Sequence, residues 1–345
     1  MSKTYILHQD IDNGYINRNI FYILGFDSSL GTIIFDDKKV ILLFDNRYYQ
    51  LIKNLKYKIK NRFEFLFGKT YEIEIILLDQ TFENRLKNII KGKSVIIEEN
   101  IPVLFYKNIK KLTQKNIEFT DNIFKQERLI KSKNEIKNIK NAIKIIEKVY
   151  KEIYLIKEKL IGKKEYEVRQ IIQKLIIELG GEGESFPTIV AFGKNSAIPH
   201  HQTGNTKIGN GPLLIDMGVI YKGYCSDFTR TFWIGEKTKN YNEFIKIKNI
   251  VKKAHDLGKK FTEKNINITG KELDKVVRNF INEKGYGDYF THSTGHGVGI
   301  QIHEQPWISN KKGDQTLEKG MVFTIEPGIY LPMNFGVRWE NIIII

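Results

Sequence analysis

The 345-residue sequence has a single cysteine, Cys225, and lacks long apolar runs. One cysteine excludes an internal disulfide and a cysteine-rich metal site. No window approaches the roughly 18 apolar residues of a membrane-spanning helix, and residues 1–21 lack the apolar core of a signal peptide. We therefore expect a cytoplasmic protein that has no membrane as a partner.

Acidic residues are outnumbered, since 55 Lys and Arg face 40 Asp and Glu, which gives a formal net charge of +15. A clustered basic face would favour a polyanion such as nucleic acid. The lysines, however, are spread through segments such as residues 134–160, where they alternate with Ile and Glu as on a solvated helix face. We expect no nucleic-acid partner. A non-catalytic protein that binds RNA or another protein through a basic surface stays open as an alternative.

The first third of the sequence alternates short apolar runs with polar turns. We predict strands at residues 19–26, 31–37, 39–49, 72–79 and 94–100, and helices at residues 49–60 and 83–92. The polar residues 36–39 predict a hairpin connection between the second and third of these strands. Because strands alternate with helices, we predict a small α/β domain at residues 1–122.

A region of long helices and then glycine-rich strands follows. Ser132 and Glu135 form a capping-box pattern, and apolar residues at a 3.6-residue spacing predict a helix from there to about residue 160. Further helices are predicted at residues 164–179 and 246–260, and after a second capping box at Thr269 and Glu272. We therefore predict an α+β domain at residues 130–345, with helices packed on a curved, mostly antiparallel sheet.

Histidine is scarce, yet three of the seven histidines, His292, His296 and His303, lie in the short motif HSTGHGVGIQIHEQP. Its glycines would each cost a helix about 1 kcal/mol, so we predict a loop that runs into a strand over residues 298–304. Imidazoles supply metal ligands or proton donors, and glycines allow close approach of the backbone. Each histidine alone is compatible with an ordinary structural role, so the interpretation depends on the residues around it.

Four carboxylates occupy apolar strand contexts in which an unpaired charge is costly. They are Asp216 in LLIDMG, Asp227 in GYCSDFTRTFWIG, Glu326 in VFTIEPGIY and Glu340 in GVRWENIIII. Pairing of Asp227 with Arg230 is the alternative, but it leaves Asp216 unexplained. Together with one or two histidines, this oxygen-rich set suits manganese, cobalt, iron or zinc, and its charge can neutralise two divalent ions.

The order of these residues resembles that of the pita-bread metallopeptidases, the family of methionine aminopeptidase, aminopeptidase P and prolidase. The motifs FPTIVAFGKNSAIPHH, GYCSDFTRTF, HEQP and EPGIY are similar to its Xaa-Pro branch, and YILGFDSSLG and LFDNRYYQ are similar to the creatinase-type N-terminal domain of that branch. The resemblance implies that the metal ligands are Asp216, Asp227, His296, Glu326 and Glu340. It also implies that His200, His292, His303 and Arg338 surround the substrate, with Arg338 near the metals, whereas His201 is read as an ordinary residue.

The implied reaction is hydrolysis of the peptide bond before proline by a hydroxide that bridges two divalent ions, manganese being the expected metal. Glu326 is the expected proton acceptor and donor, and His292 or His303 the expected donor to the oxyanion. We predict an Xaa-Pro aminopeptidase that acts on peptides with proline in second position and forms a homodimer. An Xaa-Pro dipeptidase (prolidase) is the alternative. A creatinase-like hydrolase, which needs no metal, is disfavoured because all five ligands are present.

Overall fold

The computed structural model describes residues 3–78, 86, 88–90, 92–265 and 267–345. Contacts between residues divide the chain into an N-terminal unit, Met1–Glu127, and a C-terminal unit, Arg128–Ile345. Among the described residues, no helix combines the length and the apolar character that crossing a membrane requires.

The N-terminal unit is built on one mixed sheet. Its elements are β1 (Lys3–Asp10), α1 (Arg18–Leu24), β2 (Leu30–Phe35), β3 (Lys39–Phe44), α2 (Asn46–Phe67), β4 (Glu72–Leu77), β5 (Ser94–Glu98), α4 (Val103–Thr113) and β6 (Asn116–Thr120). Helix α5 (Lys125–Leu129) begins in this unit and ends two residues after its last residue, Glu127. The strand order is β4-β3-β2-β1-β5-β6. The pairs β1/β2 and β2/β3 are antiparallel, and the other three pairs are parallel.

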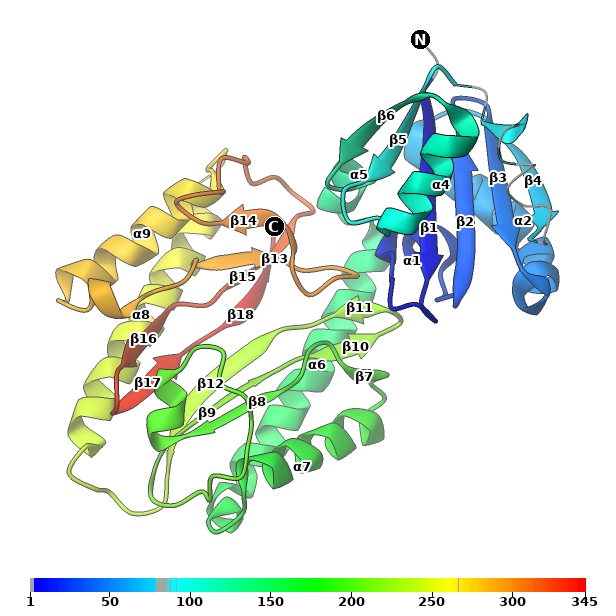
Figure 1. The fold of residues 1–345 in the computed structure, drawn as a ribbon. Coiled ribbons are helices and arrows are strands. Elements are labelled where there is room, and N and C mark those ends of the chain that lie inside the picture. Colours follow the sequence, from blue (N-terminus) through cyan, green and yellow to red (C-terminus); the bar gives the residue numbers. More distant parts are fainter. Residues whose placement is uncertain (1–2, 79–85, 87, 91, 266) are drawn as a thin grey trace. The chain divides into compact units, whose positions relative to one another are not determined.

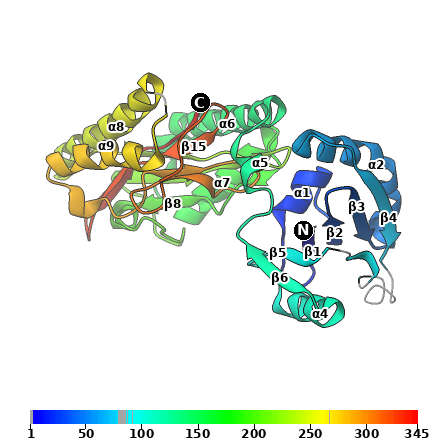
Figure 2. The same cartoon turned by 90° about the horizontal axis from the view of Figure 1, so that it is seen from above.

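Helices cover both faces of this sheet (Figure 2). Successive side chains of a strand point to opposite faces. Accordingly, Phe35 of β2 contacts Phe63 of α2, with ring centroids 5.2 Å apart, while its neighbour Ile34 packs in the cluster that contains Ile109 of α4. Each face of the sheet is therefore buried by its own helix.

The strand predicted at residues 19–26 is wrong, because this segment forms helix α1. The side chain of Asn17 caps the helix by accepting a hydrogen bond from the backbone N–H of Asn19, and Gly25 ends it in a left-handed conformation with φ of 80°. An apolar run of this length does not by itself distinguish a buried helix from a strand. Of the helix predicted at residues 83–92, residues 83–85, 87 and 91 lie outside the described residues, while residues 86, 88 and 89 are helical.

Four long helices frame the C-terminal unit (Figure 1). They are α6 (Lys133–Leu155), α7 (Glu165–Glu178), α8 (Tyr241–Lys264) and α9 (Gly270–Glu283), with short 3-10 segments at Lys157–Leu160, Gly193–Ala197 and Gly287–Tyr289. Both predicted capping boxes are confirmed: Ser132 and Glu135 cap α6, and Thr269 and Glu272 cap α9. The helix starts were thus correctly read from local chemistry.

The strands of the C-terminal unit form several small antiparallel sheets. They are β7 (Gly183–Glu184), β8 (Ile189–Phe192), β9 (Gly211–Met217), β10 (Val219–Tyr221), β11 (Tyr224–Cys225), β12 (Phe228–Ile234), β13 (Gly295–Gly297), β14 (Glu304–Ile308), β15 (Val322–Ile325), β16 (Gly328–Leu331), β17 (Phe335–Arg338) and β18 (Asn341–Ile344). The strand orders are β12-β9-β8, β11-β10-β7, β14-β13-β15-β18 and β16-β17. Helices α6 and α7 pack on β9 and β12, and α8 and α9 pack on β16 and β17.

The strand predicted over residues 298–304 is wrong, because residues 298–303 form the connection between β13 and β14. The backbone N–H of Gly299 donates to the carbonyl of Gln301, and the carbonyl of Gly299 accepts from the N–H of Cys225. A Cβ atom at Gly299 would meet the carboxylate of Glu304. The glycine therefore allows a tight turn whose interior is filled by the side chain of Glu304.

Candidate active site

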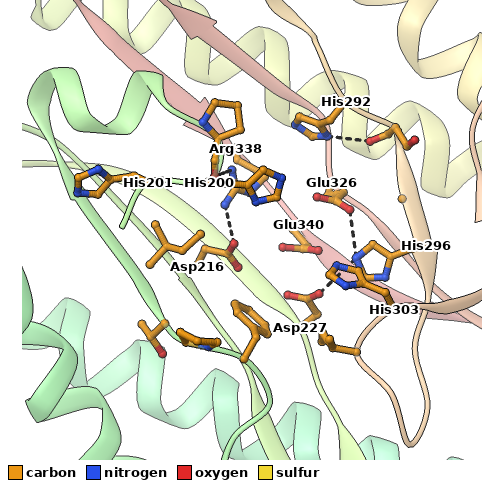
Figure 3. Close-up of a pocket in the computed structure, with 18 of the residues that line it drawn as sticks. His200, His201, Asp216, Asp227, His292, His296, His303, Glu326, Arg338 and Glu340 are labelled. Atoms are coloured by element: carbon orange, nitrogen blue, oxygen red, sulfur yellow. Dashed lines mark hydrogen bonds and ion pairs between the residues drawn. The ribbon is translucent and has the colours of Figure 1, made fainter. Parts of the chain in front are cut away.

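A cavity of about 710 Å³ opens in the C-terminal unit and is lined by every predicted site residue. They are His200, Asp216, Asp227, His292, His296, His303, Glu326, Arg338 and Glu340, drawn in Figure 3. Residues that are up to 140 positions apart in the chain thus share one cavity, whose volume falls in the range of roughly 300–1,000 Å³ typical of ligand pockets.

Strand pairing brings the four carboxylates together. Asp216 lies in β9 directly opposite Thr229 of β12, and Asp227 immediately precedes β12. On the neighbouring sheet β15 and β18 are antiparallel, so Glu326, which follows β15, and Glu340, which precedes β18, lie at the same end. The backbone N–H of Glu340 donates to the carbonyl of Thr229 and joins the two sheets at this point.

His296 completes a ligand cluster with these carboxylates. Asp227, His296 and Glu340 each offer a ligand atom, and these atoms lie within 4.8 Å of one another. His296 Nε2 lies 3.6 Å from Asp227 Oδ2 and 3.3 Å from Glu326 Oε1. Its Nδ1 donates to the carbonyl of Gly297 at 3.1 Å, which leaves the lone pair on Nε2 facing the carboxylates. Burial lowers the pKa of His296 to about 3, so the ring is neutral, as a metal ligand requires.

The carboxylates strongly oppose one another's ionisation. Burial, and then the charge of Glu340, raises the pKa of Asp227 and of Glu326 well above the ordinary values. Burial, and then the charge of Asp216, raises the pKa of Glu340 to about 8. Among the described residues, Asp216 Oδ1 and Glu340 Oε1 are buried acceptors without a hydrogen-bond partner. Buried oxygens of this kind fit divalent cations, which would both neutralise the cluster and satisfy the free acceptors.

Arg338 and Thr229 orient two of the carboxylates. Arg338 Nη2 lies 2.5 Å from Asp216 Oδ2, and its Nε donates to Thr229 Oγ1 at 3.2 Å. Thr229 Oγ1 in turn donates to Glu340 Oε2 at 2.5 Å. Sequence reasoning missed Thr229, although its position two residues after Asp227 gives it the same side parity along the strand. Arg230 instead donates to the carbonyls of Thr229 and Glu340, as expected if it does not neutralise Asp227.

His292 has both ring nitrogens engaged. Nδ1 lies 2.8 Å from the carbonyl oxygen of Ser293, which can only accept, so Nδ1 carries the proton. Burial lowers the pKa of His292 to about 3, and its Nε2 therefore accepts from the hydroxyl of Tyr330 at 2.8 Å. Arg338 Nη1 donates to the same hydroxyl at 2.8 Å. Tyr330 was not predicted from the sequence, which gives no indication of this bridge.

His303 and His200 are exposed within the cavity. The ring of His303 lies against that of His296, with centroids 4.3 Å apart, and Figure 3 shows it beside Asp227. Burial lowers the pKa of His303 as well. His200 lies near Asp216 and Arg338 in the same view. Both histidines thus line the cavity close to the carboxylate cluster.

His201 has a different environment from His200. Its Nε2 lies 2.9 Å from the buried carboxylate of Glu165 on α7. That carboxylate also accepts from the backbone N–H groups of Phe192 and Gly204. Figure 3 shows the ring of His201 apart from the other labelled side chains. These contacts agree with a structural role for His201, which is to hold the loop that carries His200.

The chain is similar to known peptidases over nearly its whole length. Residues 137–345 match the model of metallopeptidase family M24. An Xaa-Pro dipeptidase of Pyrococcus horikoshii is 36% identical over 95% of this chain and 88% of that protein, and a putative Xaa-Pro aminopeptidase of Mycoplasma pneumoniae is 34% identical over the same shares. The solved prolidase of Pyrococcus furiosus superposes with a TM-score of 0.82 at 31% identity, over 99% of this chain and 93% of that one. This likeness confirms the predicted fold, an α/β unit followed by a pita-bread unit.

Proposed function

This chain belongs to metallopeptidase family M24, and we propose that it is an Xaa-Pro aminopeptidase, which releases the residue before proline from peptides longer than a dipeptide. Its relatives named as dipeptidases and as aminopeptidases are almost equally similar to it, at 36% and 34% identity. Overall similarity therefore does not separate the two activities. The charges in the cavity support the aminopeptidase.

The observation that carries this proposal is that both arginines of the cavity already have carboxylate partners. Arg338 and Arg169 are the residues of permanent positive charge that line it, among those that the structure describes. Arg338 binds Asp216, and Arg169 donates to both carboxylate oxygens of Glu184, at 3.1 and 2.7 Å. Burial opposes ionisation of Glu184, but its hydrogen bonds, that from Arg169 foremost, lower its pKa to about 2. Glu184 therefore stays ionised and neutralises Arg169 at neutral pH.

A dipeptide would bring a free carboxylate into this cavity next to the scissile bond. Since the pKa values of His292 and His303 are lowered, these rings are neutral at pH 7 and supply no counter-charge. A dipeptide carboxylate would have to share a guanidinium with Asp216 or Glu184, or compete with the protein carboxylates for the metal ions, which disfavours the dipeptide. In a longer peptide the same position holds a neutral peptide bond, which this cavity accommodates without that cost.

The metal ligands of the proposal are the residues predicted from the sequence, Asp216, Asp227, His296, Glu326 and Glu340. Membership of the family implies divalent metal ions, and the buried acceptor oxygens of Asp216 and Glu340 fit them. Four carboxylates can balance two divalent ions, and the oxygen-rich donor set with one imidazole favours manganese. Such ions, when bound, lower the pKa of a water and polarise the scissile carbonyl.

The protein's own residues move the protons. Glu326 accepts the proton of the attacking water and delivers it to the prolyl nitrogen, which leaves readily only once it is protonated. Of the two histidines considered as donors to the oxyanion, His303 is better placed, because the nitrogens of His292 are engaged by Ser293 and Tyr330. We assign His292 to holding the bridge from Tyr330 to Arg338, and His200 to the substrate.

Three substrates test this proposal: Gly-Pro, its amide Gly-Pro-NH2, and Gly-Pro-Gly, each with metal-free protein reconstituted with manganese, cobalt or zinc. We expect the amide and the tripeptide to be cleaved with kcat/KM at least about tenfold above that of Gly-Pro, because a buried substrate carboxylate that must share its cation with a protein carboxylate is disfavoured by more than about 1.4 kcal/mol. The amide differs from the dipeptide chiefly in charge and thus isolates its effect. Equal cleavage of Gly-Pro would favour a dipeptidase, and no cleavage of any substrate would refute both activities.

The proposal includes a homodimer, as expected from the sequence. Sedimentation equilibrium of the manganese-loaded protein would give a mass near twice the 40.3 kDa of one chain. A mass equal to one chain at micromolar concentration would contradict this part of the proposal and leave the enzymatic part intact.

A further inference from the structure

We infer that Glu304 is a positioning residue for His303, and that two buried cations, Arg128 and Lys131, hold Glu304 in place. The inference rests on the proposed function, because His303 acts there as the donor to the oxyanion. Nothing in the metal-ligand set requires Glu304, which follows His303 in the chain and does not line the cavity. Its side chain instead fills the turn that carries His303.

The turn that carries His303 connects the two paired strands β13 and β14. Gly297 of β13 pairs with Glu304 of β14, and the six residues between them form the connection between the two strands. The register of the two strands shifts just before this pair, between His296 and Gly297. The N–H of Val298 donates to the carbonyl of Val322 and fixes the start of this turn. Its end, where His303 lies, is fixed by the side chain of Glu304.

The carboxylate of Glu304 folds back over the turn. It covers Gly299, where any Cβ atom would collide with it, and Oε2 accepts a long hydrogen bond of 3.4 Å from the backbone N–H of Gln301. The carboxylate thus spans the turn from its end to its middle. Since His303 is the residue before Glu304, a shift of this carboxylate moves the backbone that directs the imidazole.

Two cations from the start of the C-terminal unit secure the carboxylate. Arg128 Nη2 lies 2.6 Å from Glu304 Oε2 and 2.6 Å from Gln301 Oε1, so one guanidinium nitrogen joins the end and the middle of the turn. Lys131 Nζ lies 2.9 Å from Glu304 Oε1. The side chains of Arg128, Lys131 and Glu304 are only 5%, 2% and 8% exposed. Burial raises the pKa of Glu304, but the cations, Lys131 before Arg128, outweigh it and lower the pKa below its ordinary value.

A buried ion cluster is a poor device for stability alone. Desolvation of three charged groups offsets much of their attraction, and apolar residues of similar volume often stabilise a protein as well or better. The cluster does, however, fix geometry, because each carboxylate oxygen has its own charged donor. Because Glu304 is the residue after His303 and does not line the cavity, the geometry that the cluster fixes is that of the backbone that carries this imidazole.

A double-mutant cycle on Glu304 and His303 tests the inference with Gly-Pro-Gly as substrate. We expect Glu304→Gln to lower kcat about 10- to 100-fold with little change in KM, as for a displaced group that acts in the transition state. In the His303→Ala background the same substitution should change kcat less than about twofold, because the group that it positions is already absent. Equal losses in both backgrounds would mean that Glu304 acts independently of His303 and would overturn the inference.

A control and a second variant separate positioning from folding. Glu98 is a buried carboxylate of the N-terminal unit that accepts from Asn17, Asn19 and the N–H of Ile123, so Glu98→Gln makes the same isosteric change away from His303. It should lower Tm without changing kcat. If Glu304→Gln does not fold, Lys131→Met serves as the second variant, because it leaves Glu304 paired with Arg128 alone. The same double-mutant cycle with His303→Ala is then run with Lys131→Met.

A crystal structure of the variant tests the inference independently of activity. In Glu304→Gln we expect the ring of His303 to leave its place 4.3 Å from the ring of His296. An unmoved ring would overturn the inference whether or not the protein is active. Absence of cleavage by the wild-type protein would instead refute the proposed function, so the two failures are distinguishable.

Discussion

Glu340 should make the metal-free protein less stable as the pH rises. Its pKa is about 8 in the folded chain against an ordinary value of 4.5, so the folded state retains a proton that the unfolded state has lost. The stabilising effect of this proton is complete below pH 4.5 and disappears as the pH rises toward 8. At about 1.36 kcal/mol for each step of one in pKa, the loss between pH 5 and pH 8 is roughly 3 to 4 kcal/mol.

The substitution Glu340→Gln removes this titration and keeps the shape of the side chain. We therefore expect the free energy of unfolding of the metal-free variant, measured with urea at pH 5, 6, 7 and 8, to rise relative to wild type by roughly 3 to 4 kcal/mol over this range. Manganese should abolish the pH dependence of the wild-type protein by replacing the proton. A difference between the two proteins that stays constant from pH 5 to pH 8 would refute the assigned burial of the Glu340 charge.

Three further substitutions address the rest of the site. Asp227→Asn should abolish peptide cleavage while thermal unfolding followed by circular dichroism stays cooperative, and retained activity would contradict its role as a ligand. Tyr330→Phe leaves His292 Nε2 and Arg338 Nη1 without their shared partner, so urea unfolding should show a loss of about 1–3 kcal/mol, and an unchanged stability would contradict the bridge. Arg338→Met should weaken manganese binding about 10- to 100-fold in calorimetry, because Asp216 loses the group that orients it, and unchanged affinity would contradict that role.

Much of the fold was accessible from the sequence wherever the signal was local. The capping boxes at Ser132 and Thr269 set the starts of α6 and α9, because each depends only on hydrogen bonds between two residues three positions apart. The helix α1 was misread as a strand, although Asn17 and Gly25 carry capping signals. Its apolar run is buried apart from Phe21, and a run that is buried on most sides has no clear periodicity from which to distinguish a helix from a strand.

The candidate site could be predicted from the sequence because it places charged residues within apolar strands, where an unpaired charge is costly. Aspartate and glutamate within apolar strands indicated a metal site before any contact was known, and all nine predicted residues line one cavity. The residues that support them were not accessible. Thr229, Tyr330 and Glu304 act through partners 38 to 176 positions away, and a single sequence contains no record of such pairs. The turn at residues 298–303 was misread as a strand for the same reason. Glu304, which fills the turn, is held by Arg128 and Lys131, and these residues lie more than 170 positions earlier in the sequence.

Titration of the metal-free protein with manganese tests the central claim most directly, with bound metal and cleavage of Gly-Pro-Gly followed in the same samples. We predict two ions bound per chain, with cleavage appearing as they bind, and loss of both binding and cleavage in Asp227→Asn. Full cleavage by protein that binds no metal, or two bound ions without cleavage of any Xaa-Pro peptide, would contradict the account.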